Sequence, residues 1–540
     1  MRPNRTLAGR SCFGHLAWIH LLRAGSIACC LVPAGLAAQQ IPAASPDAPT
    51  TTTPTTTTPT TTTPTTTAPS GEQTAPKAVP APANGKAELA VSIAAREAAS
   101  WSVAQQIWEL AEPGYQEVKS SALLSKMLEE AEFRVERGVA GIPTAFTATY
   151  GEGKPVIGLL GEFDALPGLS QQATPVRAPR EGATYGHGCG HHLFGVASAS
   201  AAIAVAEQIK AGRLSGTVRY YGCPAEEGGG AKVFMVLAGL FKDCDAVFHW
   251  HPGSRNAAGD RSSLARMAVK FRFHGKSAHA AGAPEQGRSA LDAVELTNHA
   301  AELMREHTPE RTRIHHVITA GGDAPNVVPA FAEVYYYIRH PNGDVVRDLY
   351  RRLELCAQGA ALATETRLET RFEGGIMELF PNVTLAKVAM DNLKALNDIE
   401  YSEEDRRFAL KLQESLDAPL PLETIRQVED RSGTIGMGST DVGDVSWVVP
   451  TSGFSTACWA PGTPAHSWQA VACGGTPIAR KGMDLAARVL AAGVWDLMSD
   501  PKLITQAQAE HRQRLDGREY RTLMLPGQKP PLDYRKPSRR

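Results

Sequence analysis

The hydrophobic pattern changes its period twice along the chain, and this limits the folds that the sequence can adopt. From 88 to 263, helical patterns alternate with short apolar runs such as Val156–Leu160, Thr217–Gly222 and Ala246–Phe248. Helices that alternate with buried strands are typical of an α/β fold built on a mostly parallel sheet. The same pattern returns after Pro381, so we expect a second part of this domain at 377–515.

Between these two parts the apolar residues repeat every second position. Met267, Val269, Phe271 and Phe273 alternate with other residues, which indicates a half-buried strand. A helical pattern, two strands, a second helix and a last strand follow, and this β-α-β-β-α-β order predicts a ferredoxin-like α+β domain inserted at 264–376. The more polar stretch at 399–432 is interpreted as a surface insertion, and 516–540 as a C-terminal tail.

The N-terminal segment has a different composition. Thr50–Thr67 contains fifteen threonines and three prolines, and such a tract has too little apolar surface to fold, so 38–87 is predicted to be a disordered linker. Before it, four arginines precede an uncharged run too short to span a bilayer, which indicates a signal peptide over 1–37. We therefore expect export to the periplasm or secretion. A lipid anchor at Cys29 and a cytosolic protein are the weaker alternatives.

The balance of charged residues argues against a nucleic-acid partner. The chain has 55 Lys and Arg against 56 Asp and Glu, and loss of the signal arginines makes the mature protein mildly acidic. No nucleic-acid partner and no membrane span are expected. Six cysteines remain after the signal and none forms a CxxC pair, so a disulfide scaffold is not expected.

Residue types that bind metal ions gather in a glycine-rich stretch. Gly186–His192 contains three histidines and one cysteine, and glycines let the backbone bring several such side chains to one point. A glycine-rich turn with incidental histidines is an equally good interpretation of this stretch alone.

Further candidates follow strand-like segments. Glu226 and Glu227 come after the strand at 217–222, where one carboxylate can ligate a metal while its neighbour acts as a base. His249 and His251 end the strand at 246–248, and His466 lies in a loop bounded by glycine and proline. Each of these clusters alone is weak evidence for a functional site. Together they are stronger evidence, because α/β proteins build their sites at strand ends. In the inserted domain, His279, Asn326 and Arg339 could together bind an oxyanion and a carboxylate.

Taken in order, these stretches resemble the signatures of a known family. Together with Glu162–Pro167 and Asn326–Pro329 they are similar to the di-metal aminoacylase/carboxypeptidase superfamily over about 88–497. The Cys-Gly-His form at Cys189 resembles its amidohydrolase branch, and Gly438–Trp447 is similar to the p-aminobenzoyl-glutamate hydrolases of that branch. This chain has His192 where much of the branch has aspartate.

The resemblance implies two divalent metal ions, zinc or manganese, with cobalt also suited. It implies metal ligation by Cys189, His191, Glu227, His251 and His466. His251 is preferred to His249 because the family's ligand lies three residues after a strand-end hydrophobic, here Phe248. Glu226 would be the general base and Asp164 would orient a ligand. Arg339 and Asn326 would bind the substrate carboxylate, and His279 would reach across a dimer to stabilise the oxyanion.

The expected activity is hydrolysis of the amide bond of a small N-acyl or N-aroyl amino acid, by a homodimer or with a partner subunit. A dipeptidase or carboxypeptidase of the same superfamily is one alternative. A non-catalytic binding module tethered by the linker is another. A nucleotide loop at Gly186–Gly190 is discounted because the stretch lacks a GxGxxG fingerprint and a phosphate-binding lysine.

Overall fold

The computed structural model describes residues 85–535. The predicted signal peptide, Cys29 and most of the predicted linker lie outside these residues, as do the last five residues of the chain. All six cysteines of the described part are free thiols.

The α/β part is built on an eight-stranded sheet with the strand order β1-β2-β6-β3-β7-β14-β8-β13. Its central strands β6, β3, β7 and β14 are parallel, while β1 and β2 extend one edge in antiparallel fashion. The strands are β1 (Arg134–Arg137), β2 (Phe146–Glu152), β3 (Val156–Glu162), β6 (Gly216–Cys223), β7 (Ala246–Gly253), β8 (Asn256–Ala258), β13 (Val428–Asp430) and β14 (Thr451–Ala457). A separate short pair is formed by β4 (Leu166–Pro167) and β5 (Tyr185–Gly186).

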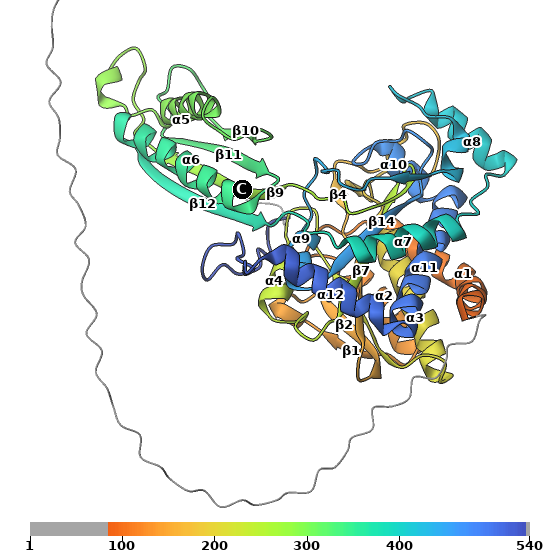
Figure 1. The fold of residues 1–540 in the computed structure, drawn as a ribbon. Helices are drawn as coiled ribbons and strands as arrows, with labels where there is room; N and C mark the ends of the chain where they lie inside the picture. The colour runs from red at the N-terminus through yellow and green to blue at the C-terminus, as the bar shows by residue number, and fades with distance from the viewer. Residues whose placement is uncertain (1–84, 536–540) are drawn as a thin grey trace, which may run out of the picture. The chain divides into compact units, whose positions relative to one another are not determined.

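Helices pack around this sheet (Figure 1), and nearly all residues of one of them, α3, are buried. Helix α3 packs on β3, β6 and β7, and α1 and α11 pack on α3. Although α3 is long and apolar enough to cross a membrane, 89% of its apolar window is buried in the protein, which is typical of a core helix. The helices are α1 (Gly85–Leu110), α2 (Val118–Glu130), α3 (His191–Lys210), α4 (Ala231–Leu237), α7 (Val383–Leu396), α8 (Glu403–Gln413), α9 (Val442–Val448), α10 (Trp468–Gly474), α11 (Pro477–Ser499) and α12 (Pro501–Leu515).

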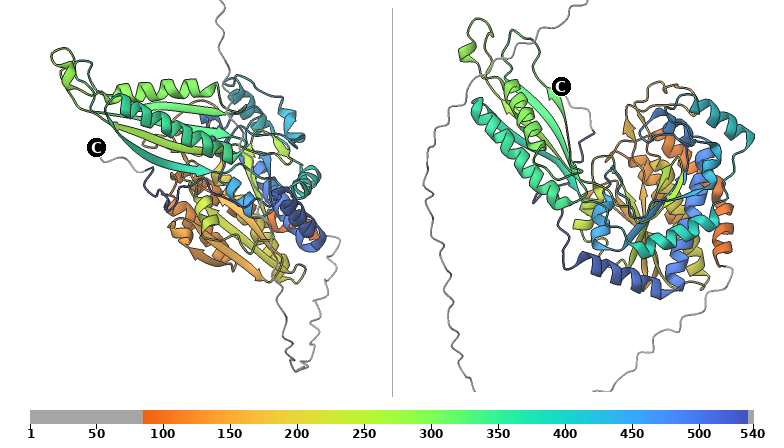
Figure 2. Two further views of the ribbon diagram at one scale, coloured as in Figure 1. Left: turned by 60° about the vertical axis from the view of Figure 1, so that its left-hand side comes forward. Right: turned by 45° about the horizontal axis from the view of Figure 1, so that its top comes forward.

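The inserted domain is a four-stranded antiparallel sheet with the order β10-β11-β9-β12. Helices α5 and α6 lie side by side on one face of it (Figure 2). Its elements are β9 (Ala265–His274), α5 (Ala290–Arg305), β10 (Arg313–Ala320), β11 (Phe331–His340), α6 (Gly343–Ala363) and β12 (Arg367–Ile376). Phe271 and Phe273 are fully buried, as the period of two predicts. The α/β fold with an inserted ferredoxin-like domain is thus confirmed.

The polar stretch at 399–432 is not a surface insertion, so that interpretation is wrong. Its strand β13 pairs in parallel with β8 at the edge of the main sheet. Tyr401, Leu412, Leu422 and Ile425 are buried in the core. Its helix α8 is polar but begins at a capping box of Ser402 and Asp405, which satisfies the free backbone N–H groups at the helix start.

Candidate active site

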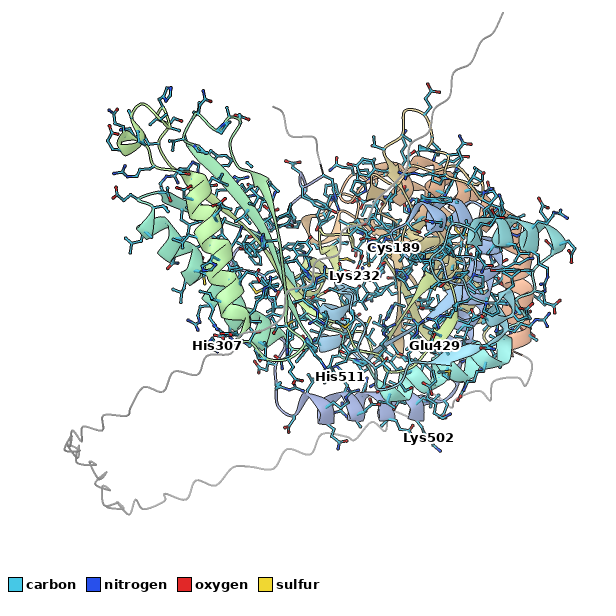
Figure 3. All side chains as sticks on the ribbon, turned by 90° about the horizontal axis from the view of Figure 1, so that it is seen from above. Cys189, Lys232, His307, Glu429, Lys502 and His511 are labelled. Atoms are coloured by element: carbon cyan, nitrogen blue, oxygen red, sulfur yellow. The ribbon has the colours of Figure 1, made fainter. Side chains whose placement is uncertain are left out.

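The candidate residues gather at the carboxyl ends of the parallel strands. Asp164 follows β3, Glu226 and Glu227 follow β6, His251 lies near the end of β7, and His466 lies in the loop after β14. Cys189 and His191 stand at the start of α3, where Gly190 adopts the left-handed conformation that turns the chain into the helix. Figure 3 shows Cys189 within the α/β domain.

The five predicted metal ligands form two overlapping groups. The donor atoms of Cys189, His191 and His251 all lie within 4.8 Å of one another, and so do those of Cys189, Glu227 and His466. The sulfur of Cys189 lies 3.2 Å from Nε2 of His251, and Oε1 of Glu227 lies 3.2 Å from Nε2 of His466. Because Cys189 belongs to both groups, these five residues could together hold two neighbouring ions.

The chemistry of these atoms fits a divalent metal. Nε2 of His191 and Oε1 of Glu227 are buried and make no hydrogen bond of good geometry, and each lies 3.2 Å from one ionisable group, Glu162 and His466 respectively. Buried polar atoms are otherwise almost always satisfied. Nδ1 of His251 donates to the carbonyl oxygen of Pro252 at 2.7 Å, which leaves the Nε2 lone pair directed toward the cluster. Thiolate, imidazole and carboxylate together suit zinc, manganese or cobalt.

Asp164 holds two of the candidate ligands at once. Its Oδ1 accepts a hydrogen bond from Nδ1 of His191 at 2.8 Å, and its Oδ2 accepts one from the backbone N–H of Glu227 at 2.9 Å. Partners of this kind fix the tautomer and orientation of a ligand. The structure therefore places Asp164 where it orients both His191 and the loop that carries Glu227.

Glu226 lies in a loop that is held in an unusual conformation. Ala225 has a φ of 54°, and its carbonyl oxygen accepts hydrogen bonds from Gly229 and Gly230 at 2.9 Å each. Burial raises the pKa of Glu226 well above its ordinary value, and the nearby carboxylates of Glu162 and Glu227 raise it further. A carboxyl group with a raised pKa is suited to proton transfer near neutral pH.

A cavity of about 630 Å³ opens beside these residues. Its lining includes Cys189, Glu226, His251, His466 and, from the inserted domain, Arg339. Nη1 of Arg339 donates to Oγ of Ser439 at 3.4 Å. This volume is typical of small-molecule sites.

The structure does not bring His279 and Asn326 into this cavity. Both are exposed on the inserted domain, and neither is among the described residues that line the cavity. They lie together, because the backbone N–H of Ala280 donates to the carbonyl oxygen of Asn326 at 3.0 Å. The role of His279 across a dimer and that of Asn326 at the substrate carboxylate remain predictions.

A buried ionic network under the site was not predicted from the sequence. Nζ of Lys232 lies 2.7 Å from Oε1 of Glu162 and 2.6 Å from Oδ1 of Asp441, and all three side chains are buried. Oε2 of Glu162 lies 3.2 Å from Nε2 of His191. In the sequence, the only indication of this network is that Lys232 is the one charged residue of the otherwise apolar helix α4.

His192 and His249 have different surroundings from the ligand candidates. Nε2 of His192 lies 3.0 Å from the carbonyl oxygen of Gly474 in the core, and burial holds its pKa well below the ordinary value. His249 lines the cavity, and burial lowers its pKa to about 4. Neither belongs to a group of converging metal-binding atoms in the described part of the chain.

The C-terminal tail reaches the same loop. Tyr534 donates from its hydroxyl to the carbonyl oxygen of Glu227 at 3.3 Å, and its ring packs edge-on against Tyr115. Tyr115 in turn donates to the carbonyl oxygen of Gly229 at 2.8 Å. The tail and Tyr115 therefore hold the backbone of the loop that carries Glu226 and Glu227.

Comparison with known proteins places this arrangement in a family. Residues 261–365 match the family model described as the peptidase dimerisation domain, M20_dimer. The chain is 41% identical over 449 residues to one subunit of the p-aminobenzoyl-glutamate hydrolase of Escherichia coli (strain K12), a match that covers 77% of this chain and 93% of that protein. The chain belongs to the M20 family. As an M20 member it is a hydrolase that acts on amide or peptide bonds.

Two further M20 comparisons extend this result. Xaa-Arg dipeptidase of Mus musculus is 29% identical over 430 residues, which cover 77% of this chain and 89% of that protein. The solved structure of a dinuclear metal binding peptidase of the M20 family from Bacillus subtilis has a TM-score of 0.52 at 16% identity, and covers 75% of this chain and 99% of that chain. The structural similarity to the Bacillus subtilis protein shows that the two chains share a fold.

Proposed function

We propose that the protein is a metal-dependent amidohydrolase that cleaves N-acyl or N-aroyl amino acids carrying a free carboxylate. The observation that carries this proposal is the pair of ligand groups sharing Cys189, with Glu226 and Arg339 lining the same cavity. The relative that is 41% identical is named as part of a p-aminobenzoyl-glutamate hydrolase, which supports an aroyl amino acid as substrate.

The side chains of this site have separate tasks in the proposed reaction. Cys189, His191, Glu227, His251 and His466 would hold the two ions. When bound, the ions supply Lewis-acid activation of the attacking water and of the scissile carbonyl group. Glu226 accepts a proton from that water on a carboxylate oxygen and donates it to the nitrogen of the departing amine. Its raised pKa favours both transfers.

Arg339 is assigned to the substrate carboxylate. A guanidinium group presents two parallel N–H donors that match the two oxygens of a carboxylate. Arg339 faces the cavity, and its Nε is buried without a hydrogen bond. A substrate carboxylate would satisfy that atom.

A homodimer, export of the protein and a partner subunit are further parts of this proposal. The match of 261–365 to a dimerisation domain supports association through the inserted domain. The Escherichia coli relative is named as one subunit of its hydrolase, which supports a partner subunit. Size-exclusion chromatography with light scattering of the protein from the culture's periplasmic fraction tests the first two parts.

The decisive experiment separates the base from the metal ligands. The purified chain is loaded with zinc or manganese, its metal content is quantified, and hydrolysis of N-benzoylglycine, N-acylglutamates and dipeptides is measured. Glu226→Gln is expected to keep its metal and lose most turnover, whereas Cys189→Ala and His466→Ala lose metal as well. Near-normal activity of Glu226→Gln would falsify the base assignment, and faster cleavage of dipeptides than of acyl amino acids would favour a dipeptidase.

A further inference from the structure

One buried glutamate close to the site takes no part in the proposed reaction. Glu117 directly precedes helix α2, and its side chain is fully buried. Within residues 85–535, no lysine, arginine or histidine nitrogen lies within 4.0 Å of its carboxyl oxygens. Burial and the nearby charge of Asp164 raise the pKa of Glu117 to about 8. Burying a carboxyl group without a cation costs free energy, so its position needs a reason other than stability.

The hydrogen bonds of Glu117 lead to the loop of the proposed base. Oε1 of Glu117 accepts a hydrogen bond from the backbone N–H of Ala225 at 2.8 Å, and Oε2 forms one of 3.0 Å with Oγ1 of Thr144. Ala225 and Thr144 are buried as well. Ala225 lies 108 positions after Glu117 in the sequence and directly before Glu226. The backbone next to the proposed base is therefore held by a distant side chain.

This contact acts on a residue in a strained conformation. The φ of 54° at Ala225 lies in the left-handed region, which residues with a Cβ atom rarely adopt. Strain of this kind persists only where the surrounding contacts enforce it. If the N–H of Ala225 lost its acceptor, relaxation of this φ would rotate the peptide group that joins Ala225 to Glu226. The carboxyl group of Glu226 would then move.

The segment that carries Glu117 contacts both ends of this loop. A Cβ atom at Gly114 would lie 2.9 Å from the Cβ atom of Ala225, so glycine permits the close approach of the two backbones. Tyr115 donates to the carbonyl oxygen of Gly229 at 2.8 Å, while Glu117 accepts from Ala225. The start and the end of the loop are thus fixed to one segment between α1 and α2.

We propose that Glu117 is a positioning residue for Glu226, which it holds at the attacking water through the backbone N–H of Ala225. This inference rests on the proposed function. Glu117 is not among the residues that line the cavity, so it does not contact the substrate. Its loss should therefore lower kcat and leave KM and metal content nearly unchanged.

Glu117→Met tests the role, because methionine has a similar length and no acceptor for the N–H of Ala225. With the metal-loaded chain and N-benzoylglutamate as substrate, kcat is expected to fall by about 10- to 100-fold, the usual effect of a misplaced catalytic group. Steady-state kinetics separates kcat from KM, and metal analysis confirms that the ions are retained. An unchanged kcat overturns the proposal, and so does a rise in KM at unchanged kcat.

Two matched variants distinguish positioning from a general loss of stability. Because the pKa of Glu117 is about 8, the group is largely protonated near neutral pH, and glutamine resembles that form. Glu117→Gln retains an acceptor for Ala225 and should keep most of the wild-type kcat. Thr144→Val removes only the contact at Oε2 and should keep kcat although stability falls. A loss of kcat in either variant as large as in Glu117→Met overturns the proposal.

Hydrogen exchange measures the contact without turnover. In peptides that cover 223–230, the N–H of Ala225 should exchange at least ~10-fold faster in Glu117→Met than in the wild type or Thr144→Val, since loss of the acceptor favours local opening. Glu117→Asp, which shortens the side chain by one methylene, replaces Glu117→Met if that variant does not fold. Equal exchange in all variants overturns the proposal. If the exchange differs but the wild type hydrolyses no substrate, the proposed function fails, whereas the hold of Glu117 on the loop stands.

Discussion

Nη2 of Arg535 donates a hydrogen bond to the carbonyl oxygen of Glu227 at 2.8 Å. These two residues are 308 positions apart, and the contact joins the C-terminal tail to the loop that carries the proposed general base, Glu226, and a proposed metal ligand, Glu227. The hydroxyl of Tyr534 donates to the same carbonyl oxygen. The tail therefore positions this loop although it contributes no side chain to the cavity.

Removal of the end of the tail should slow turnover without unfolding the protein. A chain that stops after Leu532 loses both donors to Glu227, so the loop gains freedom and we expect kcat to fall by about 10- to 100-fold. The midpoint of thermal unfolding should fall only slightly, because Tyr534 packs against the edge of one core and is not one of its fully buried members. Steady-state kinetics and calorimetry on the metal-loaded chain measure both quantities.

A chain that stops after Arg535 is the matched control, since it keeps both donors and should behave as the full chain does. Tyr534→Phe removes one hydroxyl and should have an intermediate effect on kcat. If the two truncated chains have the same activity, the tail has no positioning role.

The buried network of Lys232 is a separate test of the structure. Lys232→Met leaves the carboxylates of Glu162 and Asp441 buried without their shared cation, which typically destabilises a protein by about 3–5 kcal/mol. Urea unfolding of the intact chain followed by tryptophan fluorescence measures this change. Lys242→Met, at an exposed lysine, should have almost no effect, and equal stability of the two variants would rule out a structural role for the network.

Asp164 should act on metal binding through the residues that it orients. Asp164→Asn retains the shape, but an amide has one acceptor oxygen and cannot accept from both Nδ1 of His191 and the N–H of Glu227. We expect metal affinity to fall by about 10- to 100-fold. Competition with a fluorescent chelator measures the affinity, and Asp243→Asn, at an exposed surface aspartate that pairs with Arg219, is the control. Unchanged metal affinity would contradict the orienting role.

The fold was predicted well where the apolar period was regular. The alternation from Met267 to Phe273 indicated β9 correctly, and the order of helices and strands indicated the inserted domain. The prediction was wrong at 399–432 because the buried residues of that stretch are irregularly spaced and its strand β13 has only three residues. Its contribution to the sheet depends on pairing with β8, about 170 positions earlier, which no local pattern reveals.

The sequence predicted those site residues whose type is typical of metal binding and whose position follows a strand. Histidines, a cysteine and paired glutamates after strands indicated a metal cluster, and the structure brings all five proposed ligands together. Lys232 carries no such signal, because a charged residue in a sequence is usually at the surface. Its burial follows from contacts with the distant Glu162 and Asp441 and becomes visible only in the folded chain.

His279 has the tautomer that its proposed role needs. Its Nδ1 accepts hydrogen bonds from the backbone N–H groups of Ala281 at 3.2 Å and Gly282 at 3.0 Å, so in the neutral ring the proton is on Nε2. The side chain is exposed on the inserted domain and does not line the cavity of its own chain. An N–H donor presented away from its own subunit is suited to stabilising an oxyanion in a neighbouring one.

Mixed dimers test this sharing of residues between subunits. His279→Ala and Glu226→Gln should each be inactive alone, but a mixed dimer has one site with both an intact Glu226 and an intact His279 from its neighbour. One of the two sites of each mixed dimer works, so purified mixed dimers should have about half of wild-type activity. Co-expression of the two variants with different tags, followed by tandem purification and assay, measures this value. Recovery of no activity in purified mixed dimers would show that His279 does not act in the neighbouring site. Substantial activity of His279→Ala alone would show that the reaction does not need it.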